Sequence, residues 1–349
     1  MKIAVYTIAK NEEKFVEAWH QSTLDADYRL ILDTGSTDKT VDLARSLGID
    51  VHVIDIFPWR FDTARNIALS IVPEEIDYCI ALDMDEVLCN GWRAQIEKID
   101  KSTTRPRYKY VWSWLEDGRE GLVYGGDKIH SRHGYRWKHP VHEVLIPNEI
   151  QEKQSWIQDF EIHHHPDPTK SRGQYFDLLK LAVEEDPKND RNQFYLAREY
   201  FYHNQTEKAI DHFNQFLELS SWPAERAAAY RMLFKLTNNF TFLYLALMED
   251  PLRKETLVAL ADFYYKNNNW KACKHFAEAA ISITEKPLDY LCEAEAWGSA
   301  AYDYAALSYF NLGDSVNAIL NGYQAVCMEP KNQRLVNNLN WYIKTKNTN

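Results

Sequence analysis

The chain has 349 residues, of which 45% are hydrophobic and 26% charged, and its formal net charge is -11. This composition is typical of a globular protein with one large domain or two, and the acidity disfavours nonspecific binding to DNA or anionic membranes. No run of about 18 apolar residues occurs, so we expect no membrane span. The apolar run near the N-terminus is too short for a signal peptide, and the five cysteines lack CxxC spacing. We therefore expect reduced thiols and a cytoplasmic location.

Strand and helix signals alternate over the first hundred residues. The predicted strands are 2–8, 28–36, 50–56 and 78–85, and the predicted helices are 11–23, 36–48 and 61–72. Ser36 or Thr37 is expected to cap the second helix, and Gly48 to end it. This alternation predicts a mostly parallel sheet, in which ligands bind beyond the carboxyl ends of the strands.

Polar residues stand at those strand ends. Thr7, Asp33, Asp83 and Asp85 each follow or close a predicted strand. Two carboxylates at positions i and i+2, as in the sequence LDMDE, can turn toward one ligand, and their hard oxygens suit Mg²⁺ or Mn²⁺. A charged surface turn is the alternative interpretation of this motif.

The segment 101–165 is less regular. Residues 108–115 alternate as a strand with Tyr108, Tyr110, Trp112 and Trp114 on one face, and residues 160–165 form a late strand. In that late strand Phe160 and Ile162 share a face with His164, which predicts that His164 points inward, whereas His163 and His165 point the other way.

From about residue 170 the pattern is helical and repetitive. Stretches beginning at Tyr200, Tyr264 and Tyr309 align with one another. In each, an aromatic residue is followed by a turn residue (Asn204, Asn268, Gly313) and then by a small one (Ala209, Cys273, Ala318). The pattern resembles tetratricopeptide helical hairpins, with a degenerate unit over 220–257. The small residues would let paired helices approach closely.

Two further motifs accompany LDMDE. In LDTGSTDKT, Asp33 precedes a glycine and a helix start, where free N–H groups favour anionic ligands. PWRFDTARN adds Arg65, a candidate partner for a phosphate.

The ordered motifs YTIAKNEE, LDTGSTDKT, FDTARN and LDMDE resemble family 2 glycosyltransferases of the GT-A fold over residues 1–170. The resemblance implies a nucleotide-sugar donor, usually uridine-linked, and a divalent cation, Mn²⁺ or Mg²⁺. It implies that Asp85 binds the metal and that Asp83 faces the ribose or the metal. The residues that it places at the donor are Thr7, Asn11, Glu12, Asp33, Arg65 and Asp83.

Members with appended repeats carry a similar VHE segment followed by a histidine, which suggests a general base and a further metal ligand. Glu143 is the candidate base for an inverting transfer, and His142 is its competitor. Simple pairing of Glu143 with nearby basic side chains is the alternative. His164 is the favoured metal ligand beside Asp85, with His163 or His165 as the other choices.

Residues 128–142 are basic and contain no acid. They include Lys128, Arg132, Arg136 and Lys138. This segment is expected to hold the donor pyrophosphate or to guide an anionic acceptor, or else to neutralise nearby acids.

The sequence therefore predicts an α/β N-terminal GT-A (Rossmann-like) domain at 1–170, followed by an all-α helical-repeat domain at 171–349. The predicted function is metal-dependent, inverting transfer of a sugar to an acceptor, with modified DNA, a glycan and a protein all open. A nucleotidyltransferase, or a repeat-based interaction protein with an inactive catalytic domain, is the alternative.

Overall fold

A computed structural model describes residues 1–170 and 173–348 of the chain. The chain divides into two compact units, Met1–Pro187 and Lys188–Asn349. The first unit is mixed α/β and the second is all-helical, as predicted. The expected boundary between residues 170 and 171 falls on a position outside the described residues, and it stays a prediction. Helix α5 (Tyr175–Glu185) is grouped with the first unit.

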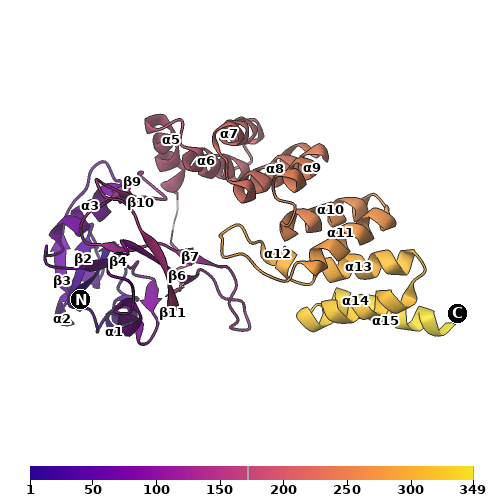
Figure 1. Cartoon of the computed structure of the whole chain (residues 1–349), viewed down its shortest axis with the longest axis horizontal. Coiled ribbons are helices and arrows are strands. Elements are labelled where there is room, and N and C mark those ends of the chain that lie inside the picture. Colours follow the sequence, from indigo (N-terminus) through magenta and orange to yellow (C-terminus); the bar gives the residue numbers. More distant parts are fainter. Residues whose placement is uncertain (171–172, 349) are drawn as a thin grey trace. The chain divides into compact units, whose positions relative to one another are not determined.

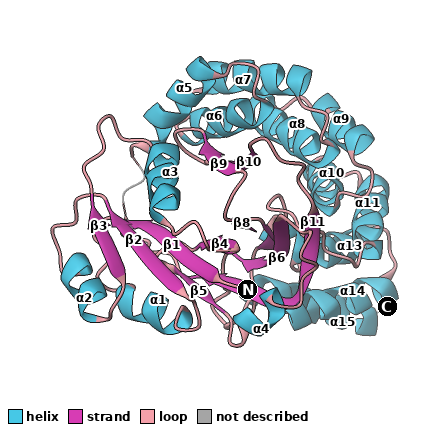
Figure 2. Ribbon diagram, turned by 60° about the vertical axis from the view of Figure 1, so that its left-hand side comes forward, coloured by secondary structure: helices cyan, strands magenta, loops and turns pink. Residues whose placement is uncertain are grey.

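A five-stranded sheet forms the centre of the first unit (Figure 2). Its order is β3-β2-β1-β4-β8, and β8 alone runs antiparallel to its neighbour. The strands are β1 (Ile3–Ala9), β2 (Tyr28–Asp33), β3 (Asp50–Val53), β4 (Tyr78–Ala81) and β8 (Ile129–Ser131). The first four agree with the predicted strands, and their carboxyl ends lie at one edge.

Helices cover both faces of this sheet because its central strands are apolar on both sides. On one face Ile3 and Val5 pack in a core with Trp19 of α1 (Val16–Ser22) and with α2 (Thr40–Ser46). On the other face Ala4 and Tyr6 pack with α3 (Phe61–Ile71). Because side chains alternate between the two faces along β1, the strand contributes to both cores, and residues at its carboxyl end remain to contact a ligand.

The predicted cap of α2 is wrong. The helix begins at Thr40, and neither Ser36 nor Thr37 caps it. The Ser36 hydroxyl instead donates to Asp33, and the Thr37 N–H donates to Asn11, because the loop folds back on the strand ends. Gly48 does follow the helix in a left-handed conformation, with φ +73°, as expected.

A second sheet is formed by the segment that is less regular in sequence. Its order is β5-β11-β6-β7. The strands are β5 (Glu86–Leu88), β6 (Arg105–Val111), β7 (Val123–Gly126) and β11 (Gln154–His164); a separate hairpin joins β9 (Tyr135–Lys138) to β10 (Val144–Pro147), and α4 is Trp92–Ile96. Phe160, Ile162 and His164 are all buried, so the predicted inward face of the late strand is confirmed.

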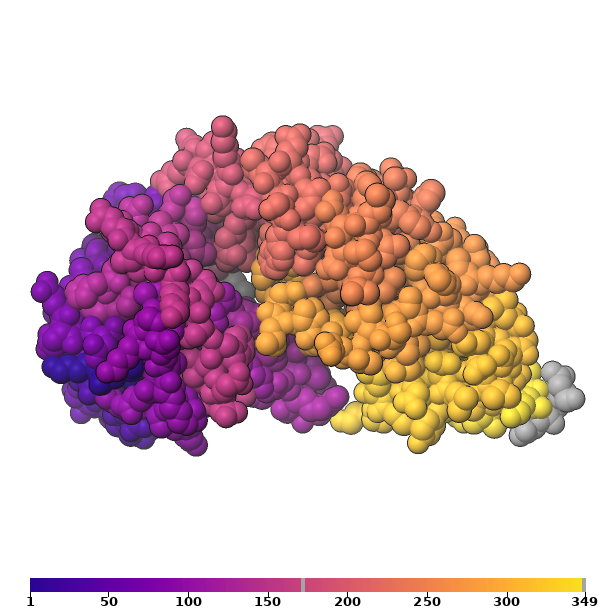
Figure 3. All heavy atoms as spheres, viewed as in Figure 1, coloured from indigo at the N-terminus to yellow at the C-terminus, as the bar shows by residue number. Residues whose placement is uncertain are grey.

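Most helices of the second unit are paired into hairpins, and the last helix packs on the final pair (Figure 1). The helices are α6 (Asp190–Tyr202), α7 (Thr206–Leu219), α8 (Pro223–Thr237), α9 (Thr241–Glu249), α10 (Lys254–Lys266), α11 (Trp270–Ser282), α12 (Ala294–Trp297), α13 (Ala300–Asn311), α14 (Ser315–Met328) and α15 (Gln333–Thr348). Figure 3, coloured along the sequence, shows the atoms of this unit as successive bands of colour that end in yellow.

The predicted repeat signature marks these hairpins. The turn residues Asn204, Asn268 and Gly313 all have positive φ, which asparagine and glycine tolerate best. The small residues that follow them, Ala209, Cys273 and Ala318, are completely buried. The degenerate unit is the α8–α9 hairpin. It keeps an aromatic residue at Phe234 and a left-handed turn at Asn238, but it places Leu243 where the other hairpins have a small residue.

Candidate functional site

The acidic turn after β4 is held beside the end of β11. Glu86 donates its N–H to the Asp83 carbonyl at 3.0 Å, which closes the turn, and β5 then begins. Strand β5 pairs antiparallel with β11, with Glu86 opposite His164. The His165 N–H also donates to the Asp85 carbonyl at 2.7 Å. This register brings the last histidines of β11 to the acids of the turn.

Asp85 and His164 form a close pair. His164 Nε2 lies 3.3 Å from Asp85 Oδ2. The other ring nitrogen, Nδ1, lies 2.9 Å from the carbonyl oxygen of Trp112, and because a carbonyl only accepts, Nδ1 carries the proton. Burial lowers the pKa of His164, but the hydrogen bonds to Asp85 and to the Trp112 carbonyl outweigh it, and the pKa is raised. Nε2 therefore faces Asp85.

The neighbouring histidines lie elsewhere. His163 Nε2 is 2.8 Å from Glu161, and its ring meets Trp114 edge-on. His165 is exposed, and its ring is parallel to that of Trp114. Of the three histidines, His164 is the one that the structure pairs with Asp85, with its ring stacked on Trp112 at 4.3 Å between centroids.

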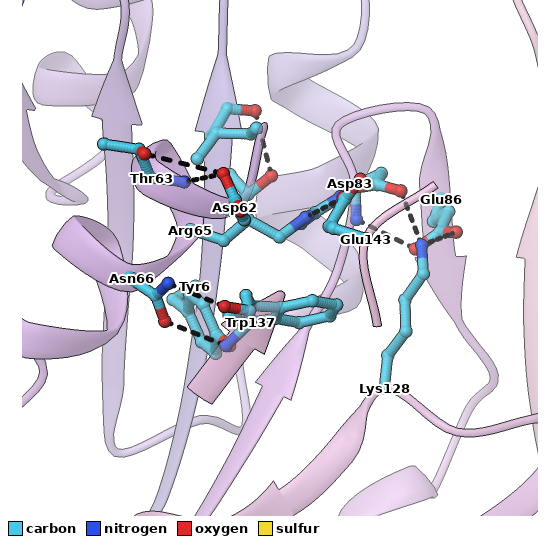
Figure 4. A network of polar contacts seen from close by, with 12 residues as sticks. Tyr6, Asp62, Thr63, Arg65, Asn66, Asp83, Glu86, Lys128, Trp137 and Glu143 are labelled. Carbon is cyan, nitrogen blue, oxygen red and sulfur yellow. Dashed lines mark hydrogen bonds and ion pairs between the residues drawn. The ribbon is translucent and has the colours of Figure 1, made fainter. Parts of the chain in front are cut away.

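Asp83 has a cation on each carboxylate oxygen (Figure 4). Arg65 Nη2 donates to Oδ1 at 2.6 Å, and Lys128 Nζ donates to Oδ2 at 2.5 Å. Burial raises the pKa of Asp83, but the two cations more than offset this and hold the pKa well below its usual range. The carboxylate is thus ionised and fixed in place.

Glu86 holds the turn in place through its hydrogen bonds. It is fully buried, and its Oε2 accepts the Asp83 N–H at 2.8 Å. Its Oε1 accepts from the Tyr110 hydroxyl at 2.5 Å and from Lys128 at 2.7 Å. Burial raises the pKa of Glu86. This role of Glu86 is not among the roles predicted from the sequence, although Glu86 is the acid that ends the LDMDE motif.

Arg65 joins Asp83 to the candidate base. Its Nε donates to Glu143 Oε1, and its guanidinium lies 4.9 Å from the centre of the Trp137 ring. The buried Nη1 has no hydrogen-bond partner among the described residues. The alternative interpretation of Glu143, pairing with a basic side chain, therefore describes its contact in this structure. His142 lies edge-on to Tyr175 at 6.0 Å, and its φ is +49°.

The remaining predicted donor residues surround the same edge. Thr7 and Asp33 are completely buried. The Asp33 carboxylate accepts the N–H groups of Gly35 and Ser36 at 3.0 and 2.8 Å, so it orders its own loop. The Asn11 side chain accepts the Thr37 N–H at 2.7 Å. Nucleoside contacts by these residues stay a prediction.

Glu12 adds another carboxylate near the acidic turn. Its Oε1 pairs with Lys170, whereas its Oε2 is buried and has no hydrogen-bond partner within residues 1–170 and 173–348. Burial raises the pKa of Glu12, and the charges of Asp85 and Asp83 raise it further. The electrostatic influence of these acids places Glu12 in the same cluster.

The basic side chains of the segment 128–142 have different partners. Lys128 pairs with the turn acids, Lys138 with Asp186 at 2.9 Å, and Arg132 donates to backbone carbonyls at the end of α3. Tyr108 and Tyr110 are buried in the core, whereas Trp112 and Trp114 are half-buried. These contacts favour the interpretation that the segment neutralises nearby acids over the interpretation that it forms a continuous binding surface for a polyanion.

The donor set at Asp85 and His164 fits a divalent cation. A carboxylate oxygen and an oriented imidazole nitrogen suit Mn²⁺, and a backbone acceptor on the second nitrogen is typical of a metal-ligating histidine. Within residues 1–170 and 173–348, no group of three or more His, Cys, Asp or Glu side chains is arranged to hold a metal. The pair would therefore supply two protein ligands, and the other positions would be filled by substrate or water.

Comparisons with known proteins are limited in extent. No protein-family model matches the chain. A curated protein from Rickettsia bellii (strain RML369-C), described as an uncharacterized glycosyltransferase, is 35% identical over 109 residues, which are 31% of this chain and 35% of that protein. The match thus spans about a third of the length of the curated relative.

Several solved structures align with about half of the chain at low similarity. One is MamA 41-end from Desulfovibrio magneticus RS-1, 14% identical over 45% of this chain and 85% of that one, with a TM-score of 0.37. Another is TTC0263, a thermophilic TPR protein of Thermus thermophilus, 13% identical over 48% and 88%, with a TM-score of 0.33. Among the described residues, no helix is both long and apolar enough to cross a membrane.

Proposed function

We propose that the chain is a glycosyltransferase that takes a sugar from a nucleotide-diphosphate donor, UDP-linked by the resemblance, with a divalent cation bound at Asp85 and His164. The observation that carries this proposal is the 3.3 Å approach of His164 Nε2 to Asp85 Oδ2 at the carboxyl edge of the four parallel strands. The mixed α/β first unit with its mostly parallel sheet is compatible with the GT-A resemblance, and the Rickettsia relative is described as an uncharacterized glycosyltransferase.

Each chain residue then has a definable task. Asp85 and His164 would hold the cation, which supplies neutralisation of the charge that develops on the departing diphosphate. Asp83 is fixed by Arg65 and Lys128 and offers its oxygens to donor hydroxyl groups. The earlier prediction that Asp83 also binds metal has less support, because a cation already sits on each of its oxygens.

The base of an inverting transfer is proposed to be Glu143. It lies beside Arg65, which also contacts Asp83, so the candidate base and the donor acids share one guanidinium. An acceptor hydroxyl would lose its proton to the Glu143 carboxylate as the sugar is transferred. His142 remains the competing candidate.

The acceptor is proposed to be a glycan or a protein. Modified DNA loses the support that the basic segment gave it, because the Lys128 and Lys138 side chains are paired with acids of this chain. The helical hairpins are compatible with a macromolecular acceptor, since repeat units present extended surfaces.

Thermal unfolding tests this proposal against its alternatives. We expect a uridine diphosphate with Mn²⁺ to raise Tm, and each alone to raise it less, because ligands that bind only the folded state stabilise it. An interaction protein with an inactive catalytic domain would show no such joint effect. The same measurement with other nucleoside diphosphates would detect a donor that is not uridine-linked.

A further inference from the structure

Lys128 occupies an unusual position behind the acidic turn. The segment that leads into β8 is fixed beside the end of β4, because the Ala81 N–H donates to the Lys128 carbonyl at 3.0 Å. From there the ammonium group reaches Asp83 Oδ2 at 2.5 Å and Glu86 Oε1 at 2.7 Å (Figure 4). One half-buried cation therefore pairs with two carboxylates, of which Asp83 is half-buried and Glu86 is completely buried.

The two aspartates of the turn therefore differ in their positively charged partners. Asp83 has Lys128 on one oxygen and Arg65 on the other, whereas the side chain of Asp85 is paired with an imidazole. A divalent cation is repelled from a carboxylate that already has a positive group on each of its oxygens. The metal can therefore bind at Asp85 and His164, and not at Asp83.

We propose that Lys128 is a positioning residue that keeps Asp83 out of the metal shell, so that the cation binds together with the donor diphosphate and only weakly before it. This inference rests on the proposed function. With only Asp85 and His164 from the protein, a hard cation that takes about six oxygen or nitrogen ligands needs the diphosphate oxygens to be held tightly. Metal and nucleotide must then strengthen each other's binding by the same factor.

The test measures Mn²⁺ binding directly, through the loss of the free-ion electron paramagnetic resonance signal, with and without UDP. Wild type should bind Mn²⁺ weakly alone and much more tightly with UDP. In Lys128→Met the freed Asp83 oxygen becomes available, so affinity for Mn²⁺ without UDP should rise about tenfold or more. The additional gain from UDP should fall.

Three further variants isolate the effect. Lys128→Arg keeps the charge and should bind Mn²⁺ as wild type does. Lys109→Met is the matched control, since Lys109 also bridges two carboxylates, Glu120 and Glu161 at 2.6 and 2.9 Å. It should leave Mn²⁺ binding unchanged. If Lys128→Met does not fold, Lys128→Met/Glu86→Gln removes one charge of each sign and should show the same tighter Mn²⁺ binding.

The possible outcomes distinguish a failure of the role of Lys128 from a failure of the proposed glycosyltransferase function. If UDP promotes Mn²⁺ binding in wild type but the affinity for Mn²⁺ alone is unchanged in the folded Lys128 variants, the role of Lys128 is overturned and the glycosyltransferase proposal stands. If wild type binds Mn²⁺ with none of UDP, GDP, ADP or TDP, the proposed metal site fails, and this inference fails with it.

Discussion

Asp83 and Glu143 are bound to the same guanidinium: Arg65 donates through Nη2 to Asp83 and through Nε to Glu143. Arg65 is almost completely buried, and it lies over the ring of Trp137. This relationship links the acidic turn after β4 to the loop that joins β9 to β10. Because the two carboxylates share Arg65, variants at this site need controls that separate the loss of charge from a change in geometry.

Replacing Asp85 with alanine should abolish the stabilisation that Mn²⁺ and the donor diphosphate give together. The substitution removes one of two protein ligands from a hard cation. The unliganded protein should keep its Tm within a few degrees, because the Asp85 side chain is partly exposed. Differential scanning fluorimetry measures both values. Asp117→Ala, at an exposed acid far along the chain from the turn, is the control. An undiminished joint shift in Asp85→Ala would rule out Asp85 as a ligand.

Glu143→Gln should bind the donor as wild type does but lower turnover by about 10²-fold or more, since the amide keeps the shape and cannot take a proton. Steady-state kinetics that resolve kcat from KM provide the measurement. His142→Gln is the companion variant. A large kcat loss in His142→Gln with normal turnover in Glu143→Gln would exchange their assignments. If Glu143 serves only to pair with Arg65, its substitution should lower Tm while kcat stays within a few fold.

The buried His130 should make the fold sensitive to mild acid. Burial lowers the pKa of His130 from 6.5 to about 4, and the ring contacts Tyr6 at 3.0 Å and the Ser131 carbonyl at 2.8 Å as a neutral group. The unfolded chain takes up the proton first, so this group destabilises the fold as pH falls from about 6.5 toward 4, by about 1.4 kcal/mol per pH unit.

Urea unfolding at pH 7 and at pH 5 measures that loss. Wild type should lose about 2 kcal/mol more than His130→Gln over this interval, and His52→Gln, at an exposed histidine, should behave like wild type. Equal losses in wild type and His130→Gln would mean that His130 does not carry the effect.

Ala209→Leu should destabilise the helical unit by about 1–3 kcal/mol, because Ala209 is completely buried in the α6–α7 hairpin and a larger side chain overpacks it. Glu207→Leu, on the exposed side of the same helix, should change stability by about 0.5 kcal/mol or less. Chemical denaturation followed by circular dichroism compares the two variants. If both have the same effect, the small residue of the repeat is not a packing requirement.

Periodicity was enough to predict the elements that local sequence controls. Alternation placed the four parallel strands and the inward face of His164, and the spacing of Tyr200, Asn204 and Ala209 identified a hairpin. The pairing of Lys128 with Asp83 could not be predicted in this way, because the residues are 45 positions apart and meet only through the antiparallel contact of β8 with β4. The second sheet was missed for a related reason: its strands include short ones whose partners are distant in sequence.

The most direct test is to incubate the protein with a panel of nucleotide sugars and identify the products by mass spectrometry. A glycosyltransferase breaks the bond between the sugar and the diphosphate, and slow reaction with water should release a nucleoside diphosphate. We predict that this product forms from at least one donor, requires Mn²⁺ or Mg²⁺, and is absent with a chelator and in Asp85→Ala. Release of a nucleoside monophosphate and a sugar phosphate would instead show cleavage within the diphosphate, as in a nucleotidyltransferase, and would contradict the proposed function.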